Sequence, residues 1–229
     1  FGATLATQAA QVMALSAPQI IEVGAGSGRL AADLMRELER RGALPERYAI
    51  LDLSGELRAR QRQTLAEELP HLLPRIEWLD RLPDHFDGLV LANELLDALP
   101  VPLVVWNEDE VFERGVTWQD GAFAWQDRPT SGRLRDEARQ LASECALPPG
   151  YLSEIGLAGR DWTAAWGNIL GRGALLLIDY GFPRHEYYHP QRDTGTLMCH
   201  YRHHAHGEPF LFPGLQDITA HVDFTAIVE

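Results

Sequence analysis

The chain has 229 residues, 45% of them hydrophobic, and a formal net charge of −13, which suits one folded domain or one domain with an insertion. The acidic balance argues against a nucleic-acid phosphate track, because there is no basic stripe to neutralise phosphates. It tolerates a cationic substrate such as an arginine-rich protein segment, but solubility is the better explanation of the charge. Two cysteines without metal-type spacing indicate a reducing compartment, and no run of residues is long enough to span a bilayer. Since the chain begins at Phe1 without a methionine, we expect residues to be missing at both ends.

The first elements predict a helix, a strand, a glycine turn and a second helix. Residues 2–15 place apolar side chains on one helical face, and residues 19–23 are rich in β-branched side chains and precede glycines. Residues 28–41 carry leucines at every fourth position with charged residues between them. Strand, turn and helix together form the first unit of a nucleotide-binding α/β domain.

The turn reads Gly-x-Gly-x-Gly and resembles motif I of class I S-adenosyl-L-methionine (SAM) methyltransferases. A dinucleotide fingerprint would place its third glycine one residue later, where Arg29 stands. An acidic residue two places before the turn suits a ligand with an ammonium and a cationic sulfur better than a diphosphate. The alternative is an ordinary βα turn with glycines for packing. The candidate cofactor-binding residues here are Glu22, Gly24, Ala25, Gly26 and Gly28.

The next two strands end in acidic residues. The second strand ends in Asp52, which follows Gly28 by 24 residues and is placed to bind ribose hydroxyls. The alternative is that Asp52 caps the next helix, for which Ser54 is the better candidate. A third strand is expected over residues 75–80, where Asp80 either accepts a hydrogen bond from an adenine amine or lies on the surface.

The fourth strand, expected over residues 87–92, is apolar throughout and leads into three polar residues: Asn93, Glu94 and Asp97. Ligands of open α/β sheets bind at such carboxyl ends. We predict that these three residues are catalytic and that Asn93 also contacts the cofactor. If the substrate is a guanidinium, Glu94 or Asp97 can pair with it in a bidentate manner. The alternative for Asp97 is an acid at a helix start, where the dipole favours it.

After this strand the pattern changes to short antiparallel elements. Residues 101–126 predict two or three strands, with turns over 107–110 and 119–121. This is an insertion after the fourth strand and not a second Rossmann half. A helix is expected over residues 134–146, and the prolines and glycine that follow end it.

The last third of the chain returns to the main sheet and then becomes rich in histidine. Residues 151–159 read as a loop carrying Glu154, which is either a carboxylate facing the substrate or a structural acid. A helix over 161–170 and a fifth strand over 173–181 follow. A mobile, substrate-facing loop is expected beyond them, with no metal, because paired cysteines and a helical His-x-x-x-His are lacking. Its histidines are His185, His189, His200, His203, His204 and His206.

These elements predict an α/β fold, a Rossmann-like doubly wound sheet of the class I SAM-methyltransferase type with a β-rich insertion after strand four. We divide the chain into a SAM-binding half over residues 1–100, a hairpin and helix insertion over 101–150, and a remainder over 151–229. The remainder holds the second half of the sheet and the histidine-rich loop. All three parts are expected to form one domain.

One run is specific enough to indicate a family. Residues 92–101 read Ala-Asn-Glu-Leu-Leu-Asp-Ala-Leu-Pro-Val and resemble the signature of the MidA family, with further matches at residues 22–30, 179–181 and 216–224. The resemblance covers nearly the whole chain. It departs from the family at Asp52, where a glutamate is common, and the shorter side chain reaches less far toward a ribose. The family's N-terminal segment and final strands are also absent, which leaves the substrate side incomplete.

The resemblance implies a SAM-dependent methyltransferase acting on arginine in proteins and linked to the assembly of respiratory complex I. It implies SAM as the cofactor, a complex I subunit as a protein substrate, a bacterial cytoplasmic location and a possible homodimer, while the acidic composition argues against a nucleic-acid partner. Two alternatives stay open. One is a non-catalytic assembly factor that binds SAM, and the other is a nicotinamide-dependent oxidoreductase, against which the glycine spacing counts.

Overall fold

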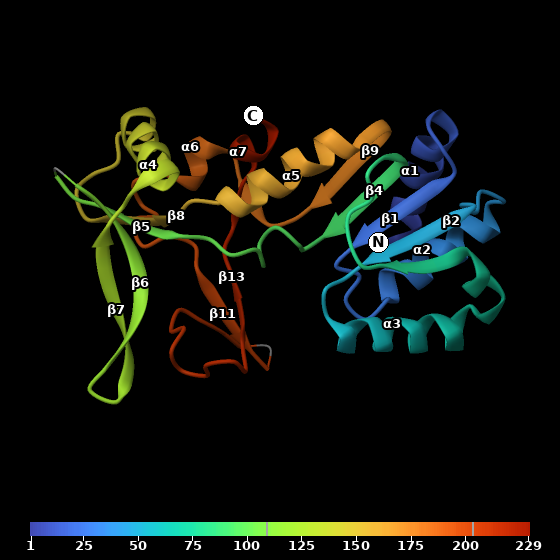
Figure 1. The fold of residues 1–229 in the computed structure, drawn as a ribbon, viewed down its shortest axis with the longest axis horizontal. Helices are drawn as coiled ribbons and strands as arrows, with labels where there is room; N and C mark the ends of the chain where they lie inside the picture. Colours follow the sequence, from blue (N-terminus) through green and yellow to red (C-terminus); the bar gives the residue numbers. More distant parts are fainter. Residues whose placement is uncertain (109, 203) are drawn as a thin grey trace. The chain divides into compact units, whose positions relative to one another are not determined.

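The computed structural model describes residues 1–108, 110–202 and 204–229. The chain forms two compact units, each built from two segments (Figure 1). The first unit comprises Phe1–Leu95 and Ala164–Ile178, and the second comprises Leu96–Thr163 and Asp179–Glu229. The division of the chain at residues 100 and 150 stays a prediction.

The first unit is built on a parallel five-stranded sheet with the order β3-β2-β1-β4-β9. The order reverses between β1 and β4, which is the switch point where ligands of open α/β sheets bind. The expected α/β Rossmann-like sheet is therefore confirmed. Its strands are β1 (Gln19–Val23), β2 (Arg47–Leu51), β3 (Ile76–Leu79), β4 (Phe86–Asn93) and β9 (Leu170–Ile178).

Helices precede or connect most of these strands, as the leucine spacing predicts. Ala31, Leu34, Met35 and Leu38 of α2 are fully buried against the core, and each leucine buried in this way contributes roughly 1.5–3 kcal/mol. The predicted helix over 161–170 starts earlier and runs directly into β9. The helices of this part are α1 (Gly2–Leu15), α2 (Arg29–Arg40), α3 (Gly55–Glu68) and the 3-10 helix η1 (Pro70–Arg75). Helix α5 (Leu157–Ile169) belongs to this unit from Ala164 onward and to the second unit before it.

The second unit begins with an antiparallel sheet of order β7-β6-β5-β8. The expected antiparallel strands are β5 (Leu103–Trp106), β6 (Val111–Gln119) and β7 (Ala122–Pro129), whereas β8 (Tyr151–Glu154) occupies a predicted loop. Asp120 and Gly121 both have positive φ, as a tight hairpin turn requires. The other predicted turn includes Asp109, which lies outside the described residues. Helix α4 (Gly132–Cys145) contributes Ala138 and Leu141 to the core of this unit.

The histidine-rich segment folds differently from the predicted loop. Its last part belongs to a three-stranded antiparallel sheet, which places His200, His204 and His206 in strands, whereas His185 lies in a short helix. His203 lies outside the described residues. In the part of the chain that is described, no cluster of three or more potential metal ligands occurs. The remaining elements are β10 (Gly181–Phe182), α6 (Arg184–Tyr187), β11 (Met198–Tyr201), β12 (His204–His206), β13 (Asp217–Thr219), β14 (Val222–Asp223) and α7 (Phe224–Val228).

None of the helices within the described ranges has both the length and the apolar character that a membrane crossing needs.

Candidate functional site

The carboxyl ends of β1, β2 and β4 bring most of the predicted site residues to one edge of the first unit. Val23, the last residue of β1, is in register with Leu51 of β2 and Ala92 of β4. The residues that follow these positions therefore lie side by side, because parallel strands end at the same edge. The glycine turn, Asp52 and Asn93 are consequently neighbours at the switch point.

The glycine turn depends on backbone conformations that other residues rarely adopt. Gly24, Gly26 and Gly28 have φ angles of 69°, 53° and 80°, in the left-handed region where a Cβ is unfavourable. Gly28 has a second constraint, because a Cβ there would lie 3.1 Å from the Cα of Gln61 in α3. The amide of Gly28 also donates to the carbonyl of Ala25 over 2.8 Å. The turn thus exposes main chain without side-chain bulk and lets α3 approach closely.

Glu22 is a buried carboxylate immediately before the turn, and its residue is only 2% exposed. It is in register with Ile50 of β2, so Tyr48, two residues earlier, presents its side chain on the same face. The Tyr48 hydroxyl donates a hydrogen bond to Glu22 Oε2 over 2.6 Å. Burial raises the pKa of Glu22 to about 7, a rise that the Tyr48 hydrogen bond opposes and the nearby charge of Asp52 supports. A nearby cationic group would favour the ionised form.

Asp52 is half-buried and held on both carboxylate oxygens. Its Oδ1 accepts from the amide of Ser54 over 2.9 Å, and its Oδ2 accepts from Gln61 Nε2 over 2.8 Å. Ser54, and not Asp52, is the helix cap, because the Ser54 hydroxyl accepts from the amide of Leu57. Since a carboxylate can accept about four hydrogen bonds, both oxygens keep capacity for ligand hydroxyls.

Gln61 is part of this site although sequence reasoning did not identify it. It is fully buried in α3 and bonds to the carbonyl of Gly26 as well as to Asp52. The available signal is positional: Leu57, Gln61 and Leu65 follow one another at four-residue spacing, so a polar residue occupies the apolar face of the helix. A buried polar group at such a position needs partners, which the turn and the second strand supply.

Asp80 follows β3 at the same edge of the sheet, but its side chain is 85% exposed and pairs with Arg58 over 2.6 Å. Its contact with a nucleobase stays a prediction.

Asn93 is the last residue of β4, and Glu94 follows it. Asn93 is half-buried, and the amide of Glu94 donates to the carbonyl of Ile178 in β9 over 2.8 Å. Glu94 has φ of 50°, a left-handed conformation that costs a residue with a Cβ roughly 1–2 kcal/mol. Strained residues of this kind occur often at ligand sites.

Asp97 belongs to the second unit, and its place in the catalytic site stays a prediction. There its amide, with that of Leu96, donates to the carboxylate of Asp179, and its carbonyl accepts from the amide of Ala220. The described residues 94–102 form turns and bends, so the alternative role of Asp97 as a helix-start acid is wrong.

Glu154 is fully buried in β8, and its carboxylate accepts hydrogen bonds from other residues of the chain. Its carboxylate accepts from the amides of Thr196 and Leu197 over 2.9–3.1 Å and from the hydroxyl of Tyr187 over 3.1 Å. A Cβ on Gly195 would lie 2.5 Å from Glu154 Oε1. These contacts support the structural interpretation, in which Glu154 holds the segment that leads into β11.

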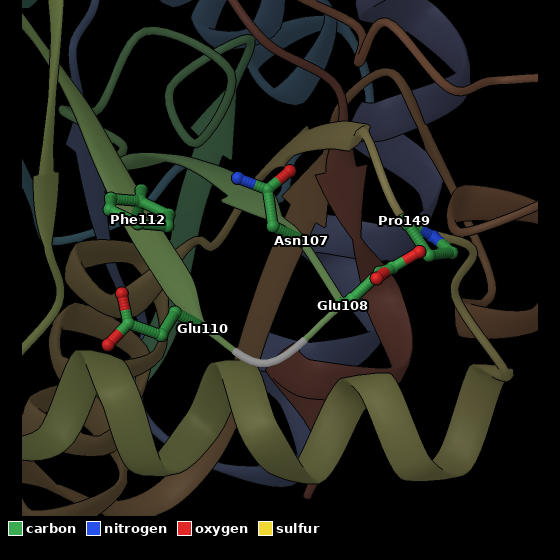
Figure 2. Close-up of a pocket in the computed structure, with 5 residues that line it drawn as sticks. All are labelled: Asn107, Glu108, Glu110, Phe112 and Pro149. Carbon is green, nitrogen blue, oxygen red and sulfur yellow. The ribbon is translucent and has the colours of Figure 1, made fainter.

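A separate open hollow of about 620 Å³ lies in the second unit (Figure 2) and contains none of the predicted site residues. It is lined by Asn107, Glu108, Glu110, Phe112 and Pro149.

Comparisons with known proteins agree with the geometry of the first unit. Residues 4–229 match a family described as "putative S-adenosyl-L-methionine-dependent methyltransferase". A crystal structure of an uncharacterised Burkholderia thailandensis protein is 51% identical, with a TM-score of 0.94, and covers 100% of this chain and 61% of that one. Another protein from that organism, crystallised with S-adenosyl-homocysteine, is 49% identical, with a TM-score of 0.92 and coverage of 99% and 58%.

More distant relatives have names that specify a substrate. The mitochondrial protein arginine methyltransferase NDUFAF7 of Mus musculus is 28% identical over an alignment of 246 residues, gaps included, which covers 90% of this chain and 50% of that protein. The Danio rerio protein of the same name is 30% identical over an alignment of 240 residues, gaps included, which covers 92% of this chain and 53% of that protein. The chain therefore spans about half the length of the curated relatives it matches.

Proposed function

Because the chain belongs to a family of S-adenosyl-L-methionine-dependent methyltransferases, we propose that it methylates an arginine side chain of a protein substrate. Its cofactor is SAM. The observation that carries the proposal is the glycine turn with three left-handed glycines between the carboxylates of Glu22 and Asp52. Family membership sets aside the nicotinamide-dependent alternative.

The residues of the first unit fit this cofactor. Asp52 retains lone pairs for ribose hydroxyls. Burial raises the pKa of Glu22 to about 7, and a cationic ligand beside the turn would favour its negatively charged form. The glycines allow close approach of the ligand to the main chain. SAM supplies a methyl carbon that is already activated by its sulfonium. The residues proposed to bind it are Glu22, Gly24, Ala25, Gly26, Gly28, Asp52, Asp80 and Asn93.

The protein then has to orient the guanidinium and remove a proton from it. A carboxylate suits both tasks. It pairs with a guanidinium through two hydrogen bonds, and it can accept the proton that the guanidinium nitrogen releases when it gains the methyl group. Glu94 and Asp97 are the carboxylates proposed for this role, and Asn93 is the catalytic residue proposed to lie beside the methyl group. The names of the mouse and zebrafish relatives support arginine as the target. The MidA resemblance extends the proposal to a respiratory complex I subunit as substrate, a cytoplasmic location and a homodimer.

The test is transfer of label from tritiated SAM to proteins of a bacterial lysate, followed by analysis of the labelled residues. We expect methylarginine with the wild type and with Glu46→Gln, an exposed glutamate in the loop that precedes β2. We expect loss of labelling with Glu94→Gln.

Binding of S-adenosyl-homocysteine without any labelling above the Glu94→Gln control would contradict the enzymatic proposal. It would favour a non-catalytic assembly factor. Label on a residue other than arginine would keep methyl transfer and refute the substrate class.

A further inference from the structure

We propose that Gln61 is a positioning residue for the ribose of the cofactor, acting through Asp52. This inference rests on the proposed function, because it assumes that Asp52 receives the ribose hydroxyls. Gln61 is fully buried, and its side chain joins the glycine turn, the end of β2 and the end of β3. Each bond lies between 2.8 and 3.0 Å.

Trp78 fixes the orientation of the Gln61 amide. An indole N–H can only donate, so the atom 3.0 Å from Trp78 Nε1 must be the amide oxygen, Oε1. The amide nitrogen then faces the carbonyl of Gly26 and the Oδ2 of Asp52, and each takes one of its two hydrogens. If the amide were flipped, its oxygen would face the carbonyl oxygen of Gly26 and the Oδ2 of Asp52, and both hydrogen bonds would be lost. The three partners therefore permit one orientation only.

The close approach of α3 to the turn makes this arrangement possible. Gly28 lacks the Cβ that would press against Gln61, and Thr64, one turn further along α3, donates to the carbonyl of Ser27 over 2.8 Å. Two side chains of one helix face thus hold two consecutive carbonyls of the turn. The helix couples the conformation of the turn to the position of the carboxylate beyond β2.

The consequence for ligand binding is pre-organisation. Asp52 is held by Ser54 on one oxygen and by Gln61 on the other, so its carboxylate loses little rotational freedom when a ligand binds. The remaining lone pairs keep a defined direction. Because Asp52 is shorter than glutamate, its reach is limited, and its orientation matters correspondingly more.

The test is calorimetric titration with S-adenosyl-homocysteine and with an analogue whose ribose lacks both hydroxyls. Gln61→Met keeps side-chain length and removes the amide. We expect it to weaken binding of S-adenosyl-homocysteine by about tenfold, the value of one hydrogen bond to a charged group, and to leave binding of the analogue within about twofold. The ratio of the two affinities on one protein sample is insensitive to a change in the folded fraction.

Two controls separate positioning from general stability. Gln63→Met changes the same residue type on the exposed face of the same helix, where Gln63 bonds only to Glu67 in the described contacts, and should leave the ratio unchanged. In an Asp52→Asn background, Gln61→Met should change the ratio no further. Equal weakening of both ligands, or no weakening of either, would overturn the inference and leave the proposed function intact. Failure of the wild type to bind S-adenosyl-homocysteine would overturn both.

Discussion

The hydroxyl of Tyr48 donates a 2.6 Å hydrogen bond to the buried carboxylate of Glu22, directly beneath the glycine turn. Burial dominates the titration of this carboxyl and raises its pKa from an ordinary 4.5 to about 7. The folded protein therefore binds this proton more tightly than the unfolded chain does. The stability that the protonated carboxyl contributes is complete below pH 4.5 and is lost as the pH rises to about 7.

Replacing Glu22 by glutamine should remove this pH dependence. The free energy of unfolding of the wild type, relative to Glu22→Gln, should fall by up to roughly 3 kcal/mol between the two pKa values and then level off. Urea titrations at intervals from pH 4 to 8 would measure it. Tyr48→Phe removes the hydrogen bond that favours the ionised form of Glu22. In this variant the free energy of unfolding should therefore continue to fall to a higher pH than in the wild type. Parallel curves for wild type and Glu22→Gln would contradict the assignment.

The turn glycines should differ in how costly they are to replace. For Gly26→Ala the cost comes only from holding alanine in a left-handed backbone conformation, because nothing lies within 4 Å of the added Cβ. We expect a loss of about 1 kcal/mol of stability. Gly28→Ala adds a 3.1 Å contact with the backbone of α3 and should cost at least about 1 kcal/mol more. Urea unfolding of the ligand-free proteins measures both. Equal losses would show that α3 moves aside freely.

Glu94 offers a way to separate backbone strain from side-chain chemistry. Glu94→Gly and Glu94→Ala both delete the carboxylate, but glycine accepts φ of 50° without penalty. We expect Glu94→Gly to be more stable than Glu94→Ala by about 1 kcal/mol and both to lose methyl transfer alike. Thermal unfolding and a SAM turnover assay supply the two measurements. Activity retained by either variant would remove Glu94 from the catalytic proposal.

Glu154 should matter for the second unit and not for cofactor binding. Glutamine at this position keeps one acceptor oxygen but presents an amide to main-chain donors, so Glu154→Gln should lose about 2–4 kcal/mol of stability. Hydrogen exchange at the amides of Thr196 and Leu197 should accelerate, because they lose their acceptor. Glu113→Gln, exposed on β6, serves as the matched control. Unchanged exchange in Glu154→Gln would refute the structural role.

Local patterns predicted the parts of the fold that depend on neighbouring residues. The β-branched run of β1, the left-handed glycines and the cap at Ser54 all follow from a few adjacent positions. Pairing between distant segments was not predictable in this way. Strand β8 is four residues long and exists because it pairs with β5, while β11 is ordered by partners on both sides.

The same distinction applies to the site. Glu22 and Asp52 could be found because acids at strand ends are visible in the sequence. For Gln61 the sequence offers only a polar residue on the apolar face of its helix; its partners come from three other segments, and the folded chain brings them together. Asp97 is close to Glu94 in sequence but belongs to the other compact unit, so its role in the site stays a prediction.

The interleaving of the two units has a consequence for synthesis. Strand β9 pairs only with β4 in the first sheet, yet Leu96–Thr163 of the second unit separates the two segments of the first. After β1 to β4 have been synthesised, the whole of this segment must be translated before β9 can pair with β4. A long intervening segment slows such pairing. A nascent chain that stopped at residue 163 would lack the closing segment of both units. Neither unit can therefore be completed before the other has largely been made.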